Sequence, residues 1–236
     1  MNVLSVDWDY FTPIDLMHEL DWGHSETFSP VIQEFLWISR GANFIMHSQS
    51  LPTTSGEEIG FWDKFTFTRD TRVFIADSHM HMVADDIRQS FVTHITNYDA
   101  HHDGGFSKNS LTNVLRGDVD CANWLAWYAL VGATCEVVYP TWRERDSFGN
   151  PQIDDISITY DRKEFESYDI VFVCKSPSWT PPWLDGAFDS FIDSLHERLP
   201  RTVFTYLEEV KTRNWDESVV RDHIQQLERF RVDSNG

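Results

Sequence analysis

The chain has 236 residues, of which 19 are Lys or Arg and 38 are Asp or Glu, so its formal net charge is −19. Proteins that bind duplex nucleic acid or an anionic membrane surface need an excess of basic residues, and the composition therefore predicts neither partner. Hydrophobic residues make up 41% of the chain and aromatic residues 14%, which is enough to fill a core and excludes an intrinsically disordered chain.

The three cysteines are widely spaced and form no CxxC pair, which argues against a disulfide framework and against a structural zinc site. The first residues, MNVLSVDWDYF, carry no basic segment, and no stretch reaches the roughly 18 apolar residues of a transmembrane helix. We therefore expect a cytoplasmic protein. No linker divides the chain, so residues 1–236 are predicted to form a single domain, and the sequence leaves open whether it forms a homo-oligomer.

Seven short apolar runs, rich in β-branched and aromatic residues, predict buried strands. In chain order they are 3–6, 73–76, 91–98, 135–139, 156–160, 170–174 and 203–206. Helices are predicted between them at 31–40, where Ser29-Pro30 begins the helix and Gly41 ends it, and at 119–131, 188–195 and 220–230. Strands that alternate with helices predict an α/β fold with a mainly parallel central sheet.

The segment Asn97-Tyr98-Asp99-Ala100-His101-His102-Asp103 follows one of the predicted strands. In an extended segment every second side chain shares a face, so Asp99, His101 and Asp103 are expected to point the same way. They would lie at the carboxyl end of a parallel strand, where open α/β folds place their ligands. Three such side chains cannot stay buried without a cation or donors, and a metal centre supplies the cation.

Two further strands end in similar groups. Ser5-Val6-Asp7-Trp8-Asp9 places Asp7 and Asp9 on one face, and Asp77-Ser78-His79-Met80-His81 does the same for His79 and His81. We expect one group of the second segment to be a ligand and another to orient a ligand by a hydrogen bond. An oxygen-rich set with two imidazoles favours manganese, magnesium or iron, and six ligands suffice for two metal ions.

At this point the residues resemble a known family. Asp99-Ala100-His101-His102-Asp103 is similar to the DAHxD signature of the arginase/agmatinase (ureohydrolase) superfamily, and Ser5-Val6-Asp7-Trp8-Asp9 is similar to its SxDxD signature. His79 stands where that family has its upstream histidine ligand. The resemblance implies a three-layer arginase/deacetylase-like fold, with the order of the metal-binding strands altered because the SxDxD-like strand comes first here.

The segments Cys121-Ala122-Asn123-Trp124-Leu125, Tyr139-Pro140-Thr141-Trp142 and Ser176-Pro177 resemble a divergent branch that includes the peptide arginases of ribosomal-peptide pathways (OspR type). The implied activity is hydrolysis of arginine side chains in a precursor peptide to ornithine and urea. Asn123, Trp142 and Ser176 become candidates for contact with this arginine-containing peptide. Trp142, Trp179 and Trp183 could flank its guanidinium by cation–π contact.

The resemblance also implies roles within the centre. Asp99 and Asp7 would bridge two Mn²⁺ ions, with His79 and Asp103 completing the ligands of one ion and His101 and Asp9 those of the other. Asp103 would accept a proton and pass it to the leaving amine, assisted by His81 or His102. Three alternatives stay open: a small-molecule ureohydrolase of the agmatinase or guanidino-acid type, a deacetylase-like amidohydrolase with one zinc ion, and a non-enzymatic metal-dependent binding protein.

Overall fold

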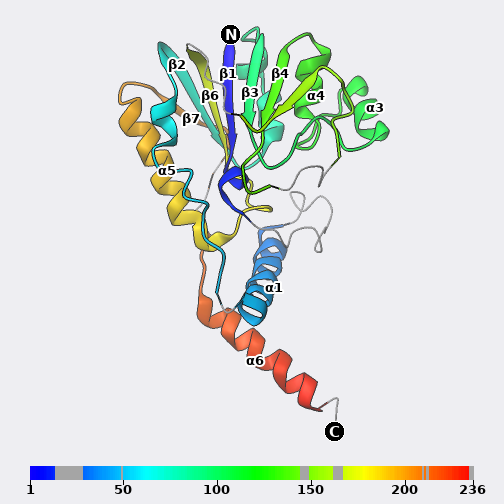
Figure 1. The fold of residues 1–236 in the computed structure, drawn as a ribbon, viewed down its shortest axis with the longest axis vertical. Helices are drawn as coiled ribbons and strands as arrows, with labels where there is room; N and C mark the ends of the chain where they lie inside the picture. Colours follow the sequence, from blue (N-terminus) through cyan, green and yellow to red (C-terminus); the bar gives the residue numbers. More distant parts are fainter. Residues whose placement is uncertain are drawn as a thin grey trace.

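A computed structural model describes residues 1–13, 29–48, 50–143, 149–161, 167–208, 210 and 213–233. Within these residues the chain forms one seven-stranded sheet in the order β5-β4-β3-β1-β6-β2-β7 (Figure 1). Every neighbouring pair is parallel, which confirms the predicted α/β class with a parallel sheet. The strands are β1 (Asn2–Asp7), β2 (Phe67–Ala76), β3 (His94–Tyr98), β4 (Thr134–Val138), β5 (Ile156–Thr159), β6 (Tyr168–Cys174) and β7 (Phe204–Tyr206).

The described helices are α1 (Pro30–Ser48), α2 (Asp85–Arg88), α3 (Lys108–Arg116), α4 (Trp124–Leu130), α5 (Asp185–Arg198) and α6 (Glu217–Asp233). The prediction that Gly41 ends the first helix is wrong, because α1 continues through this residue to Ser48. A Cβ atom at Gly41 would lie 2.9 Å from Cη2 of Trp215. The glycine therefore lets a tryptophan approach the helix rather than ending it.

Alternation along the strands sends side chains into two separate cores. In β1, Val3 belongs to one core while Leu4 and Val6 belong to the other, and β6 alternates in the same way from Ile170 to Cys174. The core that contains Leu4 and Val6 is closed by α5 and by the 3-10 helix η4 (Phe61–Lys64); the residues of α5 in it are Phe188, Phe191, Ile192 and Leu195. The core that contains Val3 is closed by α2, α4 and the 3-10 helix η5 (His79–Val83). Helices thus cover both faces of the sheet, as a three-layer α/β fold requires.

The register of the central strands brings their carboxyl ends to one level. Asp7 of β1 pairs with Cys174 of β6, which in turn pairs with Ala76 of β2, and Val6 pairs with Tyr98 of β3. The residues that follow these positions therefore meet at a single edge of the sheet. β1 lies at the centre, and the chain leaves it first toward β2 and later returns to β3 on the other side, which is the topology that opens a ligand crevice in α/β sheets.

Beyond this edge, α1 and α6 extend away from the sheet (Figure 1). A small apolar cluster of Trp37, Phe44, Leu51, Trp183 and Trp215 holds α1 against the segments that precede α5 and α6. No helix among the described residues is both long and apolar enough to cross a membrane.

Candidate metal centre

The carboxyl ends of β1 and β3 and the segment after β2 bring all six predicted ligand residues together. Two of the groups that could hold a metal ion share one residue: Asp9, Asp99 and His101 form the first, and His79, Asp99 and Asp103 form the second. Asp99 is fully buried, and its two oxygen atoms face opposite ways. Oδ1 lies 3.7 Å from Nδ1 of His101 and Oδ2 lies 3.8 Å from Nδ1 of His79.

His79 is surrounded by carboxylates on its Nδ1 side. Besides Asp99, Oδ2 of Asp7 lies 3.1 Å away and Oδ2 of Asp103 lies 3.5 Å away. The imidazole is stacked between the rings of Trp124, with centroids 5.0 Å apart, and Phe172, with centroids 5.5 Å apart. These contacts hold the ring with Nδ1 facing three oxygen atoms, which is the arrangement of a ligand set around one cation.

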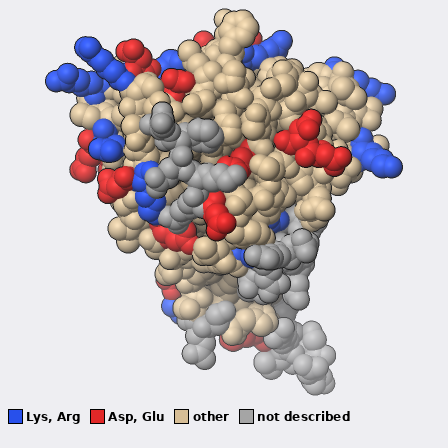
Figure 2. Space-filling view, turned by 45° about the horizontal axis from the view of Figure 1, so that its top comes forward, with Lys and Arg blue, Asp and Glu red and all other residues tan. Residues whose placement is uncertain are grey.

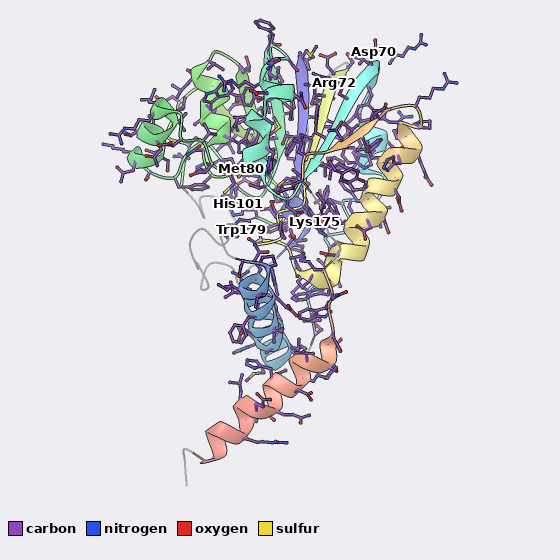
Figure 3. All side chains as sticks on the ribbon, turned by 180° about the vertical axis from the view of Figure 1, so that it is seen from behind. Asp70, Arg72, Met80, His101, Lys175 and Trp179 are labelled. Atoms are coloured by element: carbon purple, nitrogen blue, oxygen red, sulfur yellow. The ribbon has the colours of Figure 1, made fainter. Side chains whose placement is uncertain are left out.

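On the other side of Asp99, Nδ1 of His101 lies 2.7 Å from Oδ2 of Asp9. The ring of Trp179 packs against His101, with centroids 5.0 Å apart. Figure 3 shows His101, Trp179 and Lys175 close together beyond the carboxyl ends of the strands, whereas Asp70 and Arg72 lie toward the opposite end of β2. The second half of the centre is therefore bordered by an aromatic side chain.

Each carboxylate also accepts a hydrogen bond that fixes its orientation. The donors to Asp7 are the Asp9 N–H at 3.0 Å and the Ser176 hydroxyl at 2.6 Å. Those to Asp99 are the His101 N–H at 2.7 Å and the Asn97 amide at 2.9 Å, while the Ala100 N–H donates to Asp9 at 3.1 Å and the Trp124 indole to Asp103 at 2.7 Å. This outer shell is the feature that makes a metal site selective and tight.

The pKa shifts of the centre show that its buried negative charges are not balanced by the protein alone. Burial, followed by the charge of a neighbouring aspartate, raises the pKa of Asp7 and Asp9, and raises the pKa of Asp103 well above its usual range. Burial alone would lower the pKa of His79 and His101, but the surrounding aspartates outweigh it and both pKa values are raised. At each of these five residues the raised pKa favours the protonated form, so the centre favours additional positive charge.

The backbone is strained where these side chains converge. Asp103 has φ of 47° and Ser176 has φ of 48°, a left-handed conformation that is rare for residues other than glycine. Gly105, with φ of 81°, continues the same turn. Such strain persists only where the surrounding structure holds it, and it is typical of functional sites.

The donor set fits divalent cations of the hard or borderline kind. Four buried carboxylates and two imidazole Nδ1 atoms, with one carboxylate shared, provide the oxygen-rich ligands that manganese or magnesium prefers. Cys174 forms a third group with Asp7 and His79, and its Sγ lies 3.2 Å from the Ser176 hydroxyl. The clusters indicate that a metal ion can be held here.

The two histidines proposed as assistants lie in different surroundings. His81 is partly exposed and pairs with Glu208, with Nε2 3.1 Å from Oε1, and it belongs to none of the three groups. His102 is fully buried, accepts the Gly104 N–H at Nδ1 and stacks on Phe106. Since Nδ1 accepts this bond, the proton of the neutral His102 ring lies on Nε2.

The three substrate candidates border the centre in different ways. Ser176 donates to Asp7 and so supports a ligand. Trp142 donates from its indole to the carbonyl of Tyr10, the residue that follows Asp9. Asn123 is fully buried, and its side chain accepts the Asp120 N–H. It directly precedes Trp124, the tryptophan whose indole donates to Asp103.

Some functional contacts were not predicted. Ser5, hydrogen-bonded to Nε2 of His79, and Asn97, which donates to Asp99, each lie two residues before a ligand, so strand alternation could have identified them. Trp124 is different, because it reaches Asp103 from a helix 21 residues further along the chain. No local pattern signals that contact.

Comparison with protein-family models, curated proteins and solved structures finds no match for this chain. The fold and site define the class: an α/β protein with a candidate metal centre at the carboxyl edge of a parallel sheet.

Proposed function

We propose that this protein is a binuclear metallohydrolase that converts arginine residues of a precursor peptide to ornithine and releases urea, with two Mn²⁺ ions. The observation that carries the proposal is Asp99, which lies between two histidine–carboxylate groups and presents one oxygen atom to each. One shared carboxylate between two such groups favours two cations over one, and this separates the proposal from a single-zinc deacetylase.

A pair of divalent cations would supply an activated water near neutral pH and electrostatic stabilisation of the developing charge. The residues of the chain do the rest. The Trp124 indole holds Oδ2 of Asp103, which leaves Oδ1 as the atom that takes up a proton and returns it to the leaving amine. His81 pairs with Glu208, and His102 stacks on Phe106 and accepts the Gly104 N–H, so both stay candidates for assisting this transfer.

The guanidinium requires a site that binds a planar cation. Trp179 packs against His101, and an aromatic face at this position suits a guanidinium by cation–π contact. Trp179 and His101 are both partly exposed, so this side of the centre reaches the surface, as a peptide substrate requires. These features support arginine within a chain as the substrate.

The proposal is tested by incubating arginine-containing peptides with the purified protein and Mn²⁺. We expect urea, together with a loss of one CH₂N₂ unit of mass per modified arginine. Asp99→Asn removes the shared carboxylate, so turnover should fall by more than the roughly 10–100-fold typical of residues behind a ligand, and the bound metal should decrease. Asp193→Asn, on the exposed side of α5, is the matched control.

Each alternative gives a different result in the same assays. Urea from agmatine or guanidino acids but from no peptide would indicate a small-molecule ureohydrolase. One equivalent of zinc with cleavage of acyl-lysine amides would indicate a deacetylase. Metal binding and peptide binding without turnover of any substrate would contradict an enzyme and indicate a binding protein.

A further inference from the structure

A buried cysteine lies at the edge of the metal centre. Cys174 is the last residue of β6, and its Cα atom is the register partner of Asp7 in β1. Its Sγ atom forms a group with one ligand atom each of Asp7 and His79, and all three atoms lie within 4.8 Å of one another. The centre therefore contains a soft sulfur donor beside its hard oxygen donors.

A second buried cysteine has different surroundings. Cys135, in β4, is as fully buried as Cys174, but its Sγ lies near the carbonyl oxygens of Leu125 and Ala133, at 3.9 Å and 3.6 Å. It belongs to none of the candidate metal groups among the described residues. Packing as a small apolar side chain explains Cys135. The side chains around Cys174, in contrast, are themselves metal-binding groups.

Strand alternation and a nearby serine direct the thiol of Cys174 toward the centre. Phe172, two residues earlier in β6, stacks on the ring of His79, so Cys174 lies on the same face of the sheet as this ring. The Ser176 hydroxyl lies 3.2 Å from Sγ and donates to Oδ2 of Asp7 at 2.6 Å. Because a hydroxyl has only one hydrogen, the thiol is the donor in its contact with Ser176 and carries its proton in this structure.

The separations suit a small cation bound by three donors. Zn²⁺ lies about 2.3 Å from sulfur and about 2.0–2.2 Å from nitrogen or oxygen, so two of its tetrahedral donors are about 3.3–3.6 Å apart. Oδ2 of Asp7 lies 3.1 Å from Nδ1 of His79, and Cys174 needs only a small side-chain movement to reach the same range. Three protein ligands with a fourth position for water form a common zinc site.

The group that contains sulfur shares residues with the proposed manganese pair. Asp7 and His79 are expected ligands of that pair, and His79 also belongs to the oxygen-rich group with Asp99 and Asp103. Manganese prefers carboxylate oxygen, whereas zinc and similar cations bind thiolate and imidazole well. A cation that Cys174 attracts to Asp7 and His79 therefore competes with manganese for the same side chains.

We propose that Cys174 gives the centre a second mode of metal binding, in which Asp7, His79 and the thiolate of Cys174 hold a zinc-type cation and exclude the manganese pair. Coordination forms a metal–sulfur bond and breaks the S–H bond, and the proton passes to the solvent. This mode inhibits turnover, because Asp7 and His79 no longer hold Mn²⁺. The inference rests on the proposed function only for the inhibition, since the coordination itself requires no substrate.

Cobalt is the probe for this coordination, because a thiolate ligand gives Co²⁺ a charge-transfer band in the near ultraviolet and carboxylate or imidazole ligands do not. The full-length protein is freed of metal with a chelator and titrated with Co²⁺. We expect the band in wild type, its loss in Cys174→Ser, and its retention in Cys135→Ser, the matched control at the other buried cysteine. Zn²⁺ should then remove the band of wild type by displacing Co²⁺.

Competition with a chelating indicator measures the affinity for both classes of ion. Cys174→Ser should weaken Zn²⁺ binding by about tenfold or more and change Mn²⁺ binding by less than about threefold, because only zinc uses the sulfur atom. Cys174→Ala repeats the comparison without a new hydroxyl beside Ser176, and Cys135→Ser should change neither affinity. Equal losses for the two ions would contradict a role of the sulfur in selecting the metal.

Activity separates this inference from the proposed function. Added Zn²⁺ should lower urea release by the Mn²⁺-loaded protein, and Cys174→Ser should keep a larger fraction of its own zinc-free rate than wild type or Cys135→Ser. If no arginine peptide releases urea, the proposed function fails, while the cobalt spectrum and the affinities still decide on the thiolate. A wild-type spectrum without the band overturns the inference even if every variant fails to fold. A band that persists in Cys174→Ser, or equal inhibition of this variant and wild type, also overturns it.

Discussion

At the scale of single residues, Asp103 combines burial, backbone strain and a fixed hydrogen bond. Its φ of 47° turns the chain, and the Trp124 indole donates to its Oδ2. Burial and then the charge of Asp99 raise the pKa of Asp103 well above the ordinary value of 3.8. The pKa of Asp103 therefore reflects the unbalanced negative charge of the centre, which a bound cation would neutralise.

The raised pKa predicts a pH dependence for the metal-free protein. Between pH 3.8 and the raised value, the folded state holds a proton at Asp103 that the unfolded chain has released. The contribution of this residue to the free energy of unfolding therefore falls as the pH rises through this range. Asp103→Asn cannot ionise and still accepts the indole hydrogen bond. We expect the melting temperature of the variant, relative to wild type, to increase from about pH 4 to about pH 7.

Thermal melts in the presence of a chelator measure this difference. Asp193→Asn, at an exposed position of α5, should show a constant difference from wild type over the same pH range. Added Mn²⁺ should reverse the sign at neutral pH, because wild type gains a ligand-bound state that the variant binds less well. A difference for Asp103→Asn that does not change with pH would contradict the electrostatic account of the centre.

The six residues that the sequence predicted as ligands do lie together, although the geometry that brings them together differs from the one expected. Strand alternation predicts that Asp99, His101 and Asp103 share one face, which is wrong because β3 ends at Tyr98 and a loop with left-handed residues brings them together instead. In the segment after β2, the 3-10 helix η5 sends His79 into the centre and His81 toward Glu208. The residue types alone predict a metal-binding site. The conformation of the loops that carry these residues depends on packing against distant segments, which no local pattern records.

At the scale of elements, the loop after β3 rests on the segment before β5. Gly104 carries no side chain, and a Cβ atom there would lie 2.7 Å from Cδ1 of Ile156 and 2.8 Å from Cβ of Pro151. The close approach lets the Gln152 N–H donate to the carbonyl of Gly104. The position of Asp103 therefore depends on contact between two segments far apart in the chain.

Gly104→Ala should therefore lower the free energy of unfolding by about 1–3 kcal/mol, the usual cost of an overpacked contact. It should also weaken metal binding, because the adjacent Asp103 has to move. Urea unfolding and a metal titration measure the two effects. Gly186→Ala, in α5 with open space around it, is the control and should be neutral or stabilising by about 0.5–1 kcal/mol. Equal effects of the two substitutions would show that packing at Gly104 has no special role.

A buried ion pair connects β6 with α5 and with the segment before α6. Lys175, which follows β6, donates to Asp185 at 2.9 Å, and Arg213 donates to the same carboxylate at 2.6 Å. Both Lys175 and Asp185 are almost fully buried. The pair fixes the beginning of the loop that carries Ser176 and Trp179.

Asp185→Ala leaves Lys175 buried without its carboxylate and should lower the free energy of unfolding by about 3–5 kcal/mol. Glu217→Ala removes the exposed ion pair with Arg221 in α6 and should change it by less than about 1 kcal/mol. Denaturant unfolding of the two variants compares them directly. A loss below about 1 kcal/mol for Asp185→Ala would mean that the buried pair does not stabilise the loop.

Elements with a strong apolar pattern were predictable, whereas their junctions were not. All seven strands overlap the apolar runs. The inner strands are apolar because the sheet is covered on both faces, whereas the edge strands β5 and β7 are only partly buried. The helix expected over 119–131 is shorter, since α4 begins at Trp124 after a turn held by Asp120 and Asn123. That turn is stabilised by side-chain hydrogen bonds, which a hydrophobic pattern does not record.

At the scale of the whole molecule, the parallel sheet concentrates negative charge at one edge. The carboxyl ends of β1 and β3 converge there with four aspartates, while the other 34 of the 38 acidic residues lie elsewhere in the chain. Figure 2 shows acidic and basic side chains dispersed over the face in view rather than gathered into one acidic surface. We therefore expect long-range attraction of a cationic substrate to come from the net charge rather than from one acidic patch on this face.

The net charge of −19 predicts how ionic strength affects substrate capture. The test compares two peptides that share the arginine and its four neighbours on each side but carry either a lysine-rich or a neutral tail. At low salt the peptide with the lysine-rich tail should have the higher kcat/KM, because the protein attracts the cationic tail. The screening length falls from about 30 Å at 0.01 M to about 3 Å at 1 M, so the advantage of the cationic peptide should disappear over this range. The values of kcat should stay equal throughout, since the tail never reaches the centre. Steady-state kinetics at four salt concentrations measure both quantities, and an advantage that persists at 1 M would mean that a local contact, rather than the field of the whole protein, recognises the basic tail.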